Sequence, residues 1–353
     1  MTPKPATATH AGSADMKPRI FVSQPIPEAA LVHMREFGEV EVFPFAHREI
    51  SVAELESAVR RSDYVFCMHS IPITESMVAA NPSLLGYGVA HIRPDVHAIE
   101  AVERAGIKFL VADSPESPAG GGWSLNGYGL NPRATADLMV TLLLNLAYRV
   151  VEADRYCRGN GYFQEMTMDL MGLGCTGKTV SLYGLGRVAR QAVRKLKALD
   201  MNVIYTKRTR LPPAEEAGMG IEWVADPDEL VGRGDYVCML ANFEDANLRL
   251  MGEREFKLMK PTAYFINVAR GRLVDQDALI KALQDGVIAG AGLDVFWHEP
   301  PLVRDAWVQT ELRKMDNVVL TPHNGGATYD SRGAQTLGIA NAIVKEIVSR
   351  QQA

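Results

Sequence analysis

The chain has 353 residues, a formal net charge of −5 and 47% hydrophobic residues, which is typical of a globular protein with two domains of about 150 residues each. The chain is not basic enough to indicate a nucleic-acid surface. Its longest apolar stretch, residues 138–147, is too short to cross a bilayer. The first 16 residues lack the apolar core of a signal peptide, so we expect a disordered extension. The four cysteines are dispersed without a Cys-x-x-Cys pair, which favours reduced thiols, a cytoplasmic location and no bound metal.

Strand and helix patterns alternate along the first part of the chain. Strands are expected at residues 19–23, 40–43, 64–68 and 107–111, and helices at 27–37, 52–61 and 94–105. This alternation predicts a parallel sheet covered by helices. Residues 113–132 interrupt it with many glycines and prolines, which indicates a long inserted loop. A lid over a site and a surface insertion are both open interpretations.

A second alternating series follows a long apolar helix expected over residues 135–156, which we interpret as a core helix or a dimer interface. After the strand that begins at residue 179, further strands are expected at 202–205, 235–240, 263–268, 288–294 and 318–321. Six parallel strands of this kind predict a doubly wound sheet.

A glycine turn opens this second series. Gly184, Leu185 and Gly186 connect an apolar strand to an amphipathic helix that begins with Arg187 and Val188. The first glycine permits the sharp turn, the second allows a pyrophosphate to approach the backbone, and the helix N-terminus supplies free N–H groups. The motif alone is weak, but the strand before it and the helix after it favour a dinucleotide site.

The segment that follows the next strand is basic. Thr206, Lys207, Arg208, Thr209 and Arg210 stand where an NAD site usually has an acid for the ribose hydroxyls. Guanidinium, ammonium and hydroxyl groups suit a 2′-phosphate, so we expect NADP(H), with NAD as the second choice. The alternative interpretation is a solvated basic edge.

Each of three later strands is followed by a segment that contains one ionisable residue: Arg270, Glu299 or His323. Each alone has an ordinary explanation as a surface or turn residue. Together they lie at the carboxyl edge of one predicted sheet, where open α/β folds bind ligands. The same strand ends supply four further candidates for cofactor contacts, which are Val268, Ala269, Asp294 and Gly325.

The motifs around these residues are Asn-Val-Ala-Arg-Gly, Leu-Asp-Val-Phe-x-x-Glu-Pro and Thr-Pro-His-x-Gly-Gly-Ala-Thr. With the glycine turn, they resemble the D-isomer-specific 2-hydroxyacid dehydrogenases, most densely over residues 177–328. The resemblance implies an α/β protein with two doubly wound, Rossmann-like domains. The flavodoxin-like substrate domain would span residues 17–132 and 325–353, and the NAD(P)-binding Rossmann domain would span residues 133–324.

The resemblance also implies how the site works. Arg270 would grip the carboxylate and carbonyl of a 2-keto acid, His323 would be the general acid and base, and Glu299 would orient the imidazole. Asp294 would assist this network. The expected activity is NADP(H)-dependent reduction of a 2-keto acid to a D-2-hydroxy acid, in a homodimer without nucleic-acid or membrane partners. Two alternatives stay open: a formate- or phosphite-type dehydrogenase, and a nucleotide-sensing binding protein like the corepressors built on this fold.

One segment departs from the family pattern. The substrate-binding loop of the first domain is usually rich in glycine, whereas residues 90–95 contain His91, Arg93 and Pro94. Proline offers no N–H to a carboxylate, so the charged side chains of His91 and Arg93 are candidate replacements, with a surface loop as the alternative. With the long insertion, this departure suggests a substrate larger or more acidic than glyoxylate or pyruvate.

Overall fold

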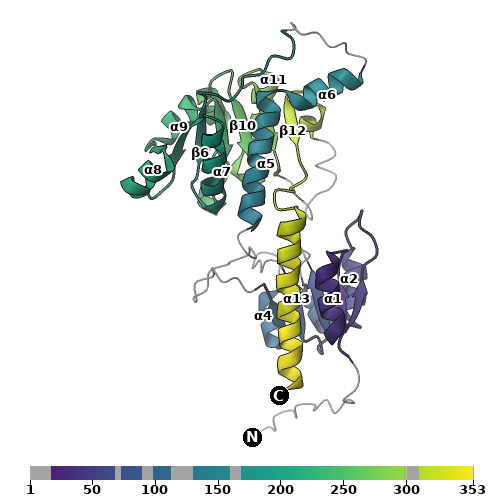
Figure 1. The fold of residues 1–353 in the computed structure, drawn as a ribbon. Helices are drawn as coiled ribbons and strands as arrows, with labels where there is room; N and C mark the ends of the chain where they lie inside the picture. Colours follow the sequence, from purple (N-terminus) through teal and green to yellow (C-terminus); the bar gives the residue numbers. More distant parts are fainter. Residues whose placement is uncertain are drawn as a thin grey trace. The chain divides into compact units, whose positions relative to one another are not determined.

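The computed structural model describes residues 17–67, 73–89, 98–112, 130–159, 168–297, 299 and 310–352. Two compact units divide the chain: the first comprises Met1–Tyr128 and Arg332–Ala353, and the second comprises Gly129–Ser331 (Figure 1). Several predictions fall outside the described residues: the N-terminal extension, residues 113–129 of the insertion, and both His91 and Arg93.

The first unit contains a five-stranded parallel sheet in the order β2-β1-β3-β4-β5, which is the flavodoxin-like order. Its strands are β1 (Arg19–Val22), β2 (Glu39–Val42), β3 (Tyr64–Cys67), β4 (Gly86–Val89) and β5 (Lys108–Leu110). Its helices are α1 (Glu28–Phe37), α2 (Val52–Val59), α3 (Glu75–Ala80), α4 (Ile99–Arg104) and most of α13 (Tyr329–Gln351).

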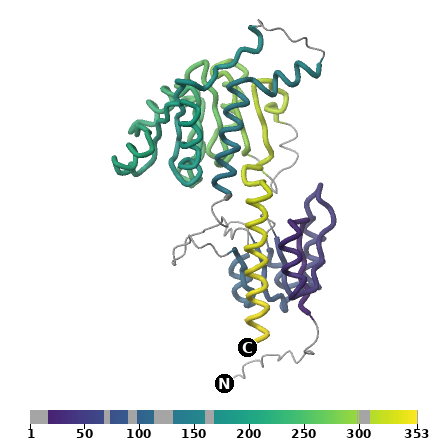
Figure 2. The backbone as a smooth tube through the Cα atoms, viewed as in Figure 1, coloured from purple at the N-terminus to yellow at the C-terminus, as the bar shows by residue number. Residues whose placement is uncertain are grey.

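Alternating strand residues give this sheet two apolar faces. Ile20 and Val22 of β1 pack with α1 and α13, whereas Phe21 between them packs with α2, α3 and α4. The C-terminal helix therefore completes the core of the N-terminal sheet. Figure 2 shows α13, in yellow, running alongside the N-terminal part of the chain. A Cβ on Gly88 would lie 2.9 Å from Ile339 Cγ2, so a glycine there lets α13 pack close to the sheet.

The second unit contains a seven-stranded parallel sheet in the order β12-β11-β10-β9-β6-β7-β8. Its strands are β6 (Thr179–Tyr183), β7 (Asn202–Thr206), β8 (Ile221–Trp223), β9 (Tyr236–Met239), β10 (Tyr264–Asn267), β11 (Gly290–Leu293) and β12 (Val318–Leu320). Its α-helices are α5 (Leu130–Ala147), α6 (Val150–Arg158), α7 (Arg187–Ala198), α8 (Pro213–Met219), α9 (Pro227–Arg233), α10 (Glu253–Leu258) and α11 (Gln276–Gln284). Short 3₁₀ turns lie at η2 (Asp245–Asn247), η3 (Gly271–Leu273) and η4 (Glu311–Lys314).

The predicted fold class is confirmed, with two differences in the second unit. A seventh strand, β8, adds to the six expected; its three residues are too few to show a period of two. The single long helix predicted over residues 135–156 is wrong, because Arg149 adopts a left-handed conformation (φ 51°) and separates α5 from α6. Helix α5 begins earlier than expected, at Leu130, and its inner face lies in the core against α7.

Within the described ranges, no single helix has both the length and the hydropathy of a membrane span. Residues 131–147 and 150–158 reach that threshold only as a pair, which is bent by 59°.

Candidate active site

The glycine turn lies at the carboxyl end of β6, between β7 and β9. Gly184 has a φ of 101°, and a Cβ there would lie 2.7 Å from the backbone nitrogen of Ala241, so only glycine fits. Gly186 is the N-cap of α7, and a Cβ there would meet no atom within 4 Å. The turn therefore combines a tight fold of the backbone with open space at the start of a helix, the arrangement that a pyrophosphate requires.

The neighbouring candidates follow from this turn. Leu185 is buried, and at the start of α7 Arg187 is exposed and Val188 is half-buried. The carbonyl of Thr206 accepts a hydrogen bond from the backbone N–H of Gly184 (3.0 Å). The end of β7 is thus tied directly to the glycine turn, which places the basic segment beside it.

Both arginines of the basic segment are paired with acids. Arg208 forms two hydrogen bonds with Glu244 (3.0 and 2.8 Å), and Arg210 forms two with Glu216 (2.9 and 2.7 Å). Arg210 also lies over the ring of Trp223, with its guanidinium carbon 4.9 Å from the ring centroid. Lys207 forms no hydrogen bond or ion pair with the part of the chain that the structure describes, and Thr209 is exposed.

Burial and hydrogen bonding oppose one another at Glu216. The hydrogen bond from Arg210 holds the pKa of the Glu216 carboxyl below its ordinary value, against the desolvation that would raise it. Glu216 also accepts a hydrogen bond from the Tyr205 hydroxyl (2.7 Å), so this acid is anchored in the fold. Sequence reasoning missed both acidic partners. Glu244 is 36 residues from Arg208, so only the fold brings these two together, whereas Glu216 is 6 residues from Arg210 and lies on α8.

The loop that carries Arg270 follows β10 and is closed by one buried side chain. Asn267, 1% exposed, donates to the Arg270 carbonyl (3.0 Å) and accepts from the Ala269 N–H (3.0 Å). The Arg270 guanidinium is exposed and donates to the Ala269 carbonyl (2.7 Å). Val268 is buried beside it.

The loops after β10 and β11 touch at a glycine. A Cβ on Gly271 would lie 1.9 Å from the carbonyl of Phe296, which no side chain could tolerate. The Arg270 loop is therefore fixed against the segment that leads to Glu299.

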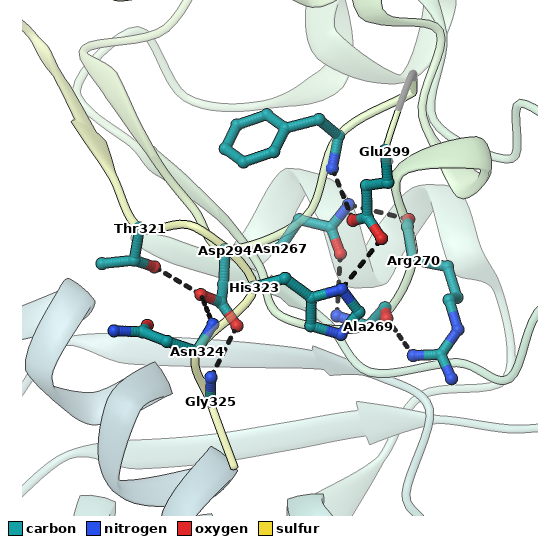
Figure 3. Close-up of polar contacts among 10 residues, drawn as sticks. Asn267, Ala269, Arg270, Asp294, Glu299, Thr321, His323, Asn324 and Gly325 are labelled. Atoms are coloured by element: carbon teal, nitrogen blue, oxygen red, sulfur yellow. Dashed lines mark hydrogen bonds and ion pairs between the residues drawn. The ribbon is translucent and has the colours of Figure 1, made fainter. Parts of the chain in front are cut away.

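His323 and Glu299 meet at the ends of adjacent strands (Figure 3). The Nδ1 atom of His323 lies 2.8 Å from Glu299 Oε2, and Glu299 Oε1 accepts a hydrogen bond from the Phe296 N–H (2.9 Å). A carboxylate beside Nδ1 favours the tautomer protonated there, which leaves Nε2 free to exchange a proton.

A buried acid holds the turn that presents His323. Asp294, 1% exposed, accepts hydrogen bonds from Thr321 Oγ1 (2.6 Å), from the Asn324 N–H (2.9 Å) and from the Gly325 N–H (3.0 Å). His323 itself donates its backbone N–H to the Asp294 carbonyl (2.8 Å) and has a φ of 52°, an unusual value for a non-glycine residue. These contacts keep the turn in its strained conformation, and they show that Asp294 acts on the backbone of the turn.

The structure thus brings the three strand ends together. Strands β10, β11 and β12 are neighbours, so Arg270, Glu299 and His323 follow three consecutive strands at one edge of the sheet. His323 and Glu299 are in contact, while the Arg270 guanidinium bonds to its own loop.

Comparisons with known proteins agree with this architecture. Residues 140–325 match the family model for the D-isomer specific 2-hydroxyacid dehydrogenase, NAD binding domain. A glyoxylate reductase of Thermococcus gammatolerans is 35% identical over 342 residues, covering 95% of this chain and 93% of that protein. A glyoxylate reductase of Pyrococcus furiosus is 34% identical over 336 residues, covering 93% of this chain and 92% of that protein.

Solved structures are similar over the same extent. A Thermus thermophilus protein aligns with a TM-score of 0.76 and 28% identity, covering 93% of this chain and 97% of that one. The NADPH-dependent glyoxylate/hydroxypyruvate reductase of Sinorhizobium meliloti, in complex with citrate, aligns with a TM-score of 0.69 and 26% identity, covering 92% and 93%.

Fold and comparisons together define an oxidoreductase that uses a nicotinamide dinucleotide. The chain belongs to the D-isomer specific 2-hydroxyacid dehydrogenase family.

Proposed function

We propose that the protein reduces a 2-keto acid to a D-2-hydroxy acid with NADPH, and that His323 donates the proton. The observation that carries this proposal is the 2.8 Å contact between His323 Nδ1 and Glu299 Oε2, beside the loop of Arg270. An oriented imidazole and a guanidinium are the groups that carbonyl reduction of an acid requires.

His323 moves the proton through Nε2. Histidine is the side chain that most readily gives and takes a proton near neutral pH. Glu299 holds Nδ1, so the opposite nitrogen is the one left for the substrate oxygen. The proton delivered there balances the negative charge that develops on the carbonyl oxygen.

Arg270 binds and stabilises the substrate. A guanidinium has five N–H donors, and the hydrogen bond to Ala269 uses one of them. The remaining donors suit a carboxylate in the forked geometry, and their positive charge stabilises the developing alkoxide. His91 and Arg93 stay predictions for further substrate contacts.

The glycine turn and the segment after β7 would hold the cofactor. The pyrophosphate would lie against Gly186 and the start of α7, and the 2′-phosphate against Lys207, Arg208 and Thr209. When bound, the nicotinamide supplies the hydride that the carbonyl carbon accepts. The absence of an acid from residues 206–210 supports NADPH over NADH, as does the NADPH-dependent relative of Sinorhizobium meliloti.

The names of the relatives suggest the substrate class. Glyoxylate reductases cover almost the whole chain, which supports a small 2-keto acid as substrate. A larger or more acidic substrate is the competing prediction from residues 90–95 and the insertion. A homodimer and a cytoplasmic location stay predictions from the sequence.

The test begins with fluorescence titrations of the protein with NADPH and NADH in parallel. Oxidation of the preferred cofactor is then measured with glyoxylate, hydroxypyruvate, pyruvate or 2-oxoglutarate as the substrate. We expect turnover with NADPH, and His323→Asn should lower kcat by about 100-fold or more, the usual contribution of a general acid. His33→Asn, a matched change on α1 of the first unit, should leave kcat unchanged. Normal turnover by His323→Asn would exclude the proposed proton donor.

A further inference from the structure

One ion pair crosses the edge of the second sheet at the glycine turn. Arg208 follows β7 and Glu244 follows β9, and these strands flank β6 on its two sides. The two hydrogen bonds between Arg208 and Glu244 therefore bridge the end of β6, where Gly184 and Gly186 lie. Ala241, near the start of the same loop as Glu244, is the residue whose backbone would meet a Cβ on Gly184.

The backbone of Glu244 is held by hydrogen bonds within its own loop. Its N–H donates to Asn247 Oδ1 (2.8 Å), its carbonyl accepts from the Asn247 N–H (3.0 Å), and Asn247 also donates to the Asn242 carbonyl (2.7 Å). The Glu244 side chain is 46% exposed and that of Arg208 is 84% exposed. An exposed pair of this kind contributes about 0–1 kcal/mol, so a strong ligand can separate it.

The neighbouring pair is built differently. The Glu216 side chain is only 8% exposed and also binds the Tyr205 hydroxyl, and Arg210 is stacked on Trp223. Separating Arg210 from Glu216 would leave a buried acid without its cation, which is costly. Arg208 is therefore the arginine of this segment that can change partner.

We propose that Glu244 sets the preference between NADPH and NADH by competing with the 2′-phosphate for Arg208. The inference rests on the proposed cofactor position. With NADPH, Arg208 leaves Glu244 and pairs with the phosphate, which offers more charge and a forked geometry. With NADH, Glu244 would supply the carboxylate for the ribose hydroxyls, since residues 206–210 supply none. The pair thus lets one site accept both cofactors, with Glu244 lowering the affinity for NADPH.

The test measures the Kd of NADPH and of NADH for the wild type, Glu244→Gln, Arg208→Gln and the double variant. Glu244→Gln should bind NADPH about two- to five-fold more tightly, the range that an exposed pair is worth, and NADH no more tightly. Arg208→Gln should weaken NADPH by about five-fold or more and leave NADH within about two-fold. In the Arg208→Gln background, Glu244→Gln should no longer tighten NADPH, because the competition acts through Arg208.

The matched control is Glu222→Gln, which breaks an exposed two-bonded pair with Arg233 (2.7 and 2.9 Å) in the same unit. It should change neither Kd. An unchanged ratio of the NADPH Kd to the NADH Kd in Glu244→Gln would overturn the inference. So would a tightening of NADPH binding by Glu244→Gln that is as large in the Arg208→Gln background as in the wild type. If Arg208→Gln also leaves NADPH binding unchanged, the proposed cofactor position fails as well, and the two failures are thereby distinguished.

Discussion

The carboxyl edge of the second unit's sheet is built differently at its two ends. At the β10–β12 end, the buried side chains of Asn267 and Asp294 hold the loops of Arg270 and His323 through hydrogen bonds to their backbone. At the β7 end, the exposed side chains of Arg208 and Glu244 hold each other. A buried, satisfied network is costly to rearrange, whereas an exposed pair is not. Under the proposed function, backbone position is fixed at the end of the edge that performs the chemistry, and ion-pair partners can change at the end that selects the cofactor.

The largest effect is expected at the fixed end. Arg270→Ala should lower kcat by at least about 100-fold, because it removes a charged donor from the developing oxyanion. Arg272→Ala is the matched control; its guanidinium lies over the ring of Phe243, 5.0 Å from the centroid. Steady-state assays should show near-normal turnover for that control. Near-normal turnover by Arg270→Ala itself would disprove the assignment.

A substitution beneath the histidine turn should affect stability and rate together. Asp294→Asn replaces one acceptor oxygen by an amide that faces the N–H and O–H donors of the turn. We expect a loss of about 1–3 kcal/mol in the free energy of unfolding, with a lower kcat. Urea titration measures the loss, and Asp316→Asn, at an exposed pair with Arg155, should change stability by less than about 0.5 kcal/mol. Equal stability of the two variants would argue against a structural role for Asp294.

A smaller effect on stability is expected at a buried acid of the first unit, Glu346. Burial alone would raise the pKa of the Glu346 carboxyl, but hydrogen bonds from Lys108 and Arg350 (both 2.7 Å) outweigh it and lower the pKa. Because the folded pKa lies below the unfolded one, the stabilisation is complete above the unfolded value of about 4.3 and is lost as pH falls through the folded value.

Glu346→Gln should therefore reduce stability by about 1 kcal/mol at neutral pH and make it less sensitive to acid below pH ~4. Thermal unfolding from pH 7 to pH 3 measures the difference between variant and wild type. A difference that stays constant across this range would show that the ion pairs of Glu346 do not control acid stability.

The strands of the second unit, and the loops that follow them, could be predicted from the sequence because short local patterns mark them. Buried parallel strands read as apolar runs, and Arg270, Glu299 and His323 each lie in the loop that follows such a run. Their placement at one edge of the sheet follows from strand order, which the alternation of strands and helices predicts in outline.

What the sequence did not predict depends on distant pairing or on single dihedral angles. The partner of Arg208 lies 36 residues away, and no local pattern marks it. The break between α5 and α6 results from the left-handed backbone of Arg149, within a segment whose apolar spacing continues through it. The role of Asp294 in holding the His323 turn depends on three contacts that exist only once β11 and β12 are paired.

The contrast between the two ends is tested most directly by steady-state kinetics with NADPH for His323→Asn and Arg208→Gln, assayed side by side. We predict that His323→Asn lowers kcat by about 100-fold with little change in the KM for NADPH, and that Arg208→Gln raises that KM while kcat stays near normal. A low kcat in Arg208→Gln, or an unchanged kcat in His323→Asn, would contradict the separation of chemistry from cofactor selection.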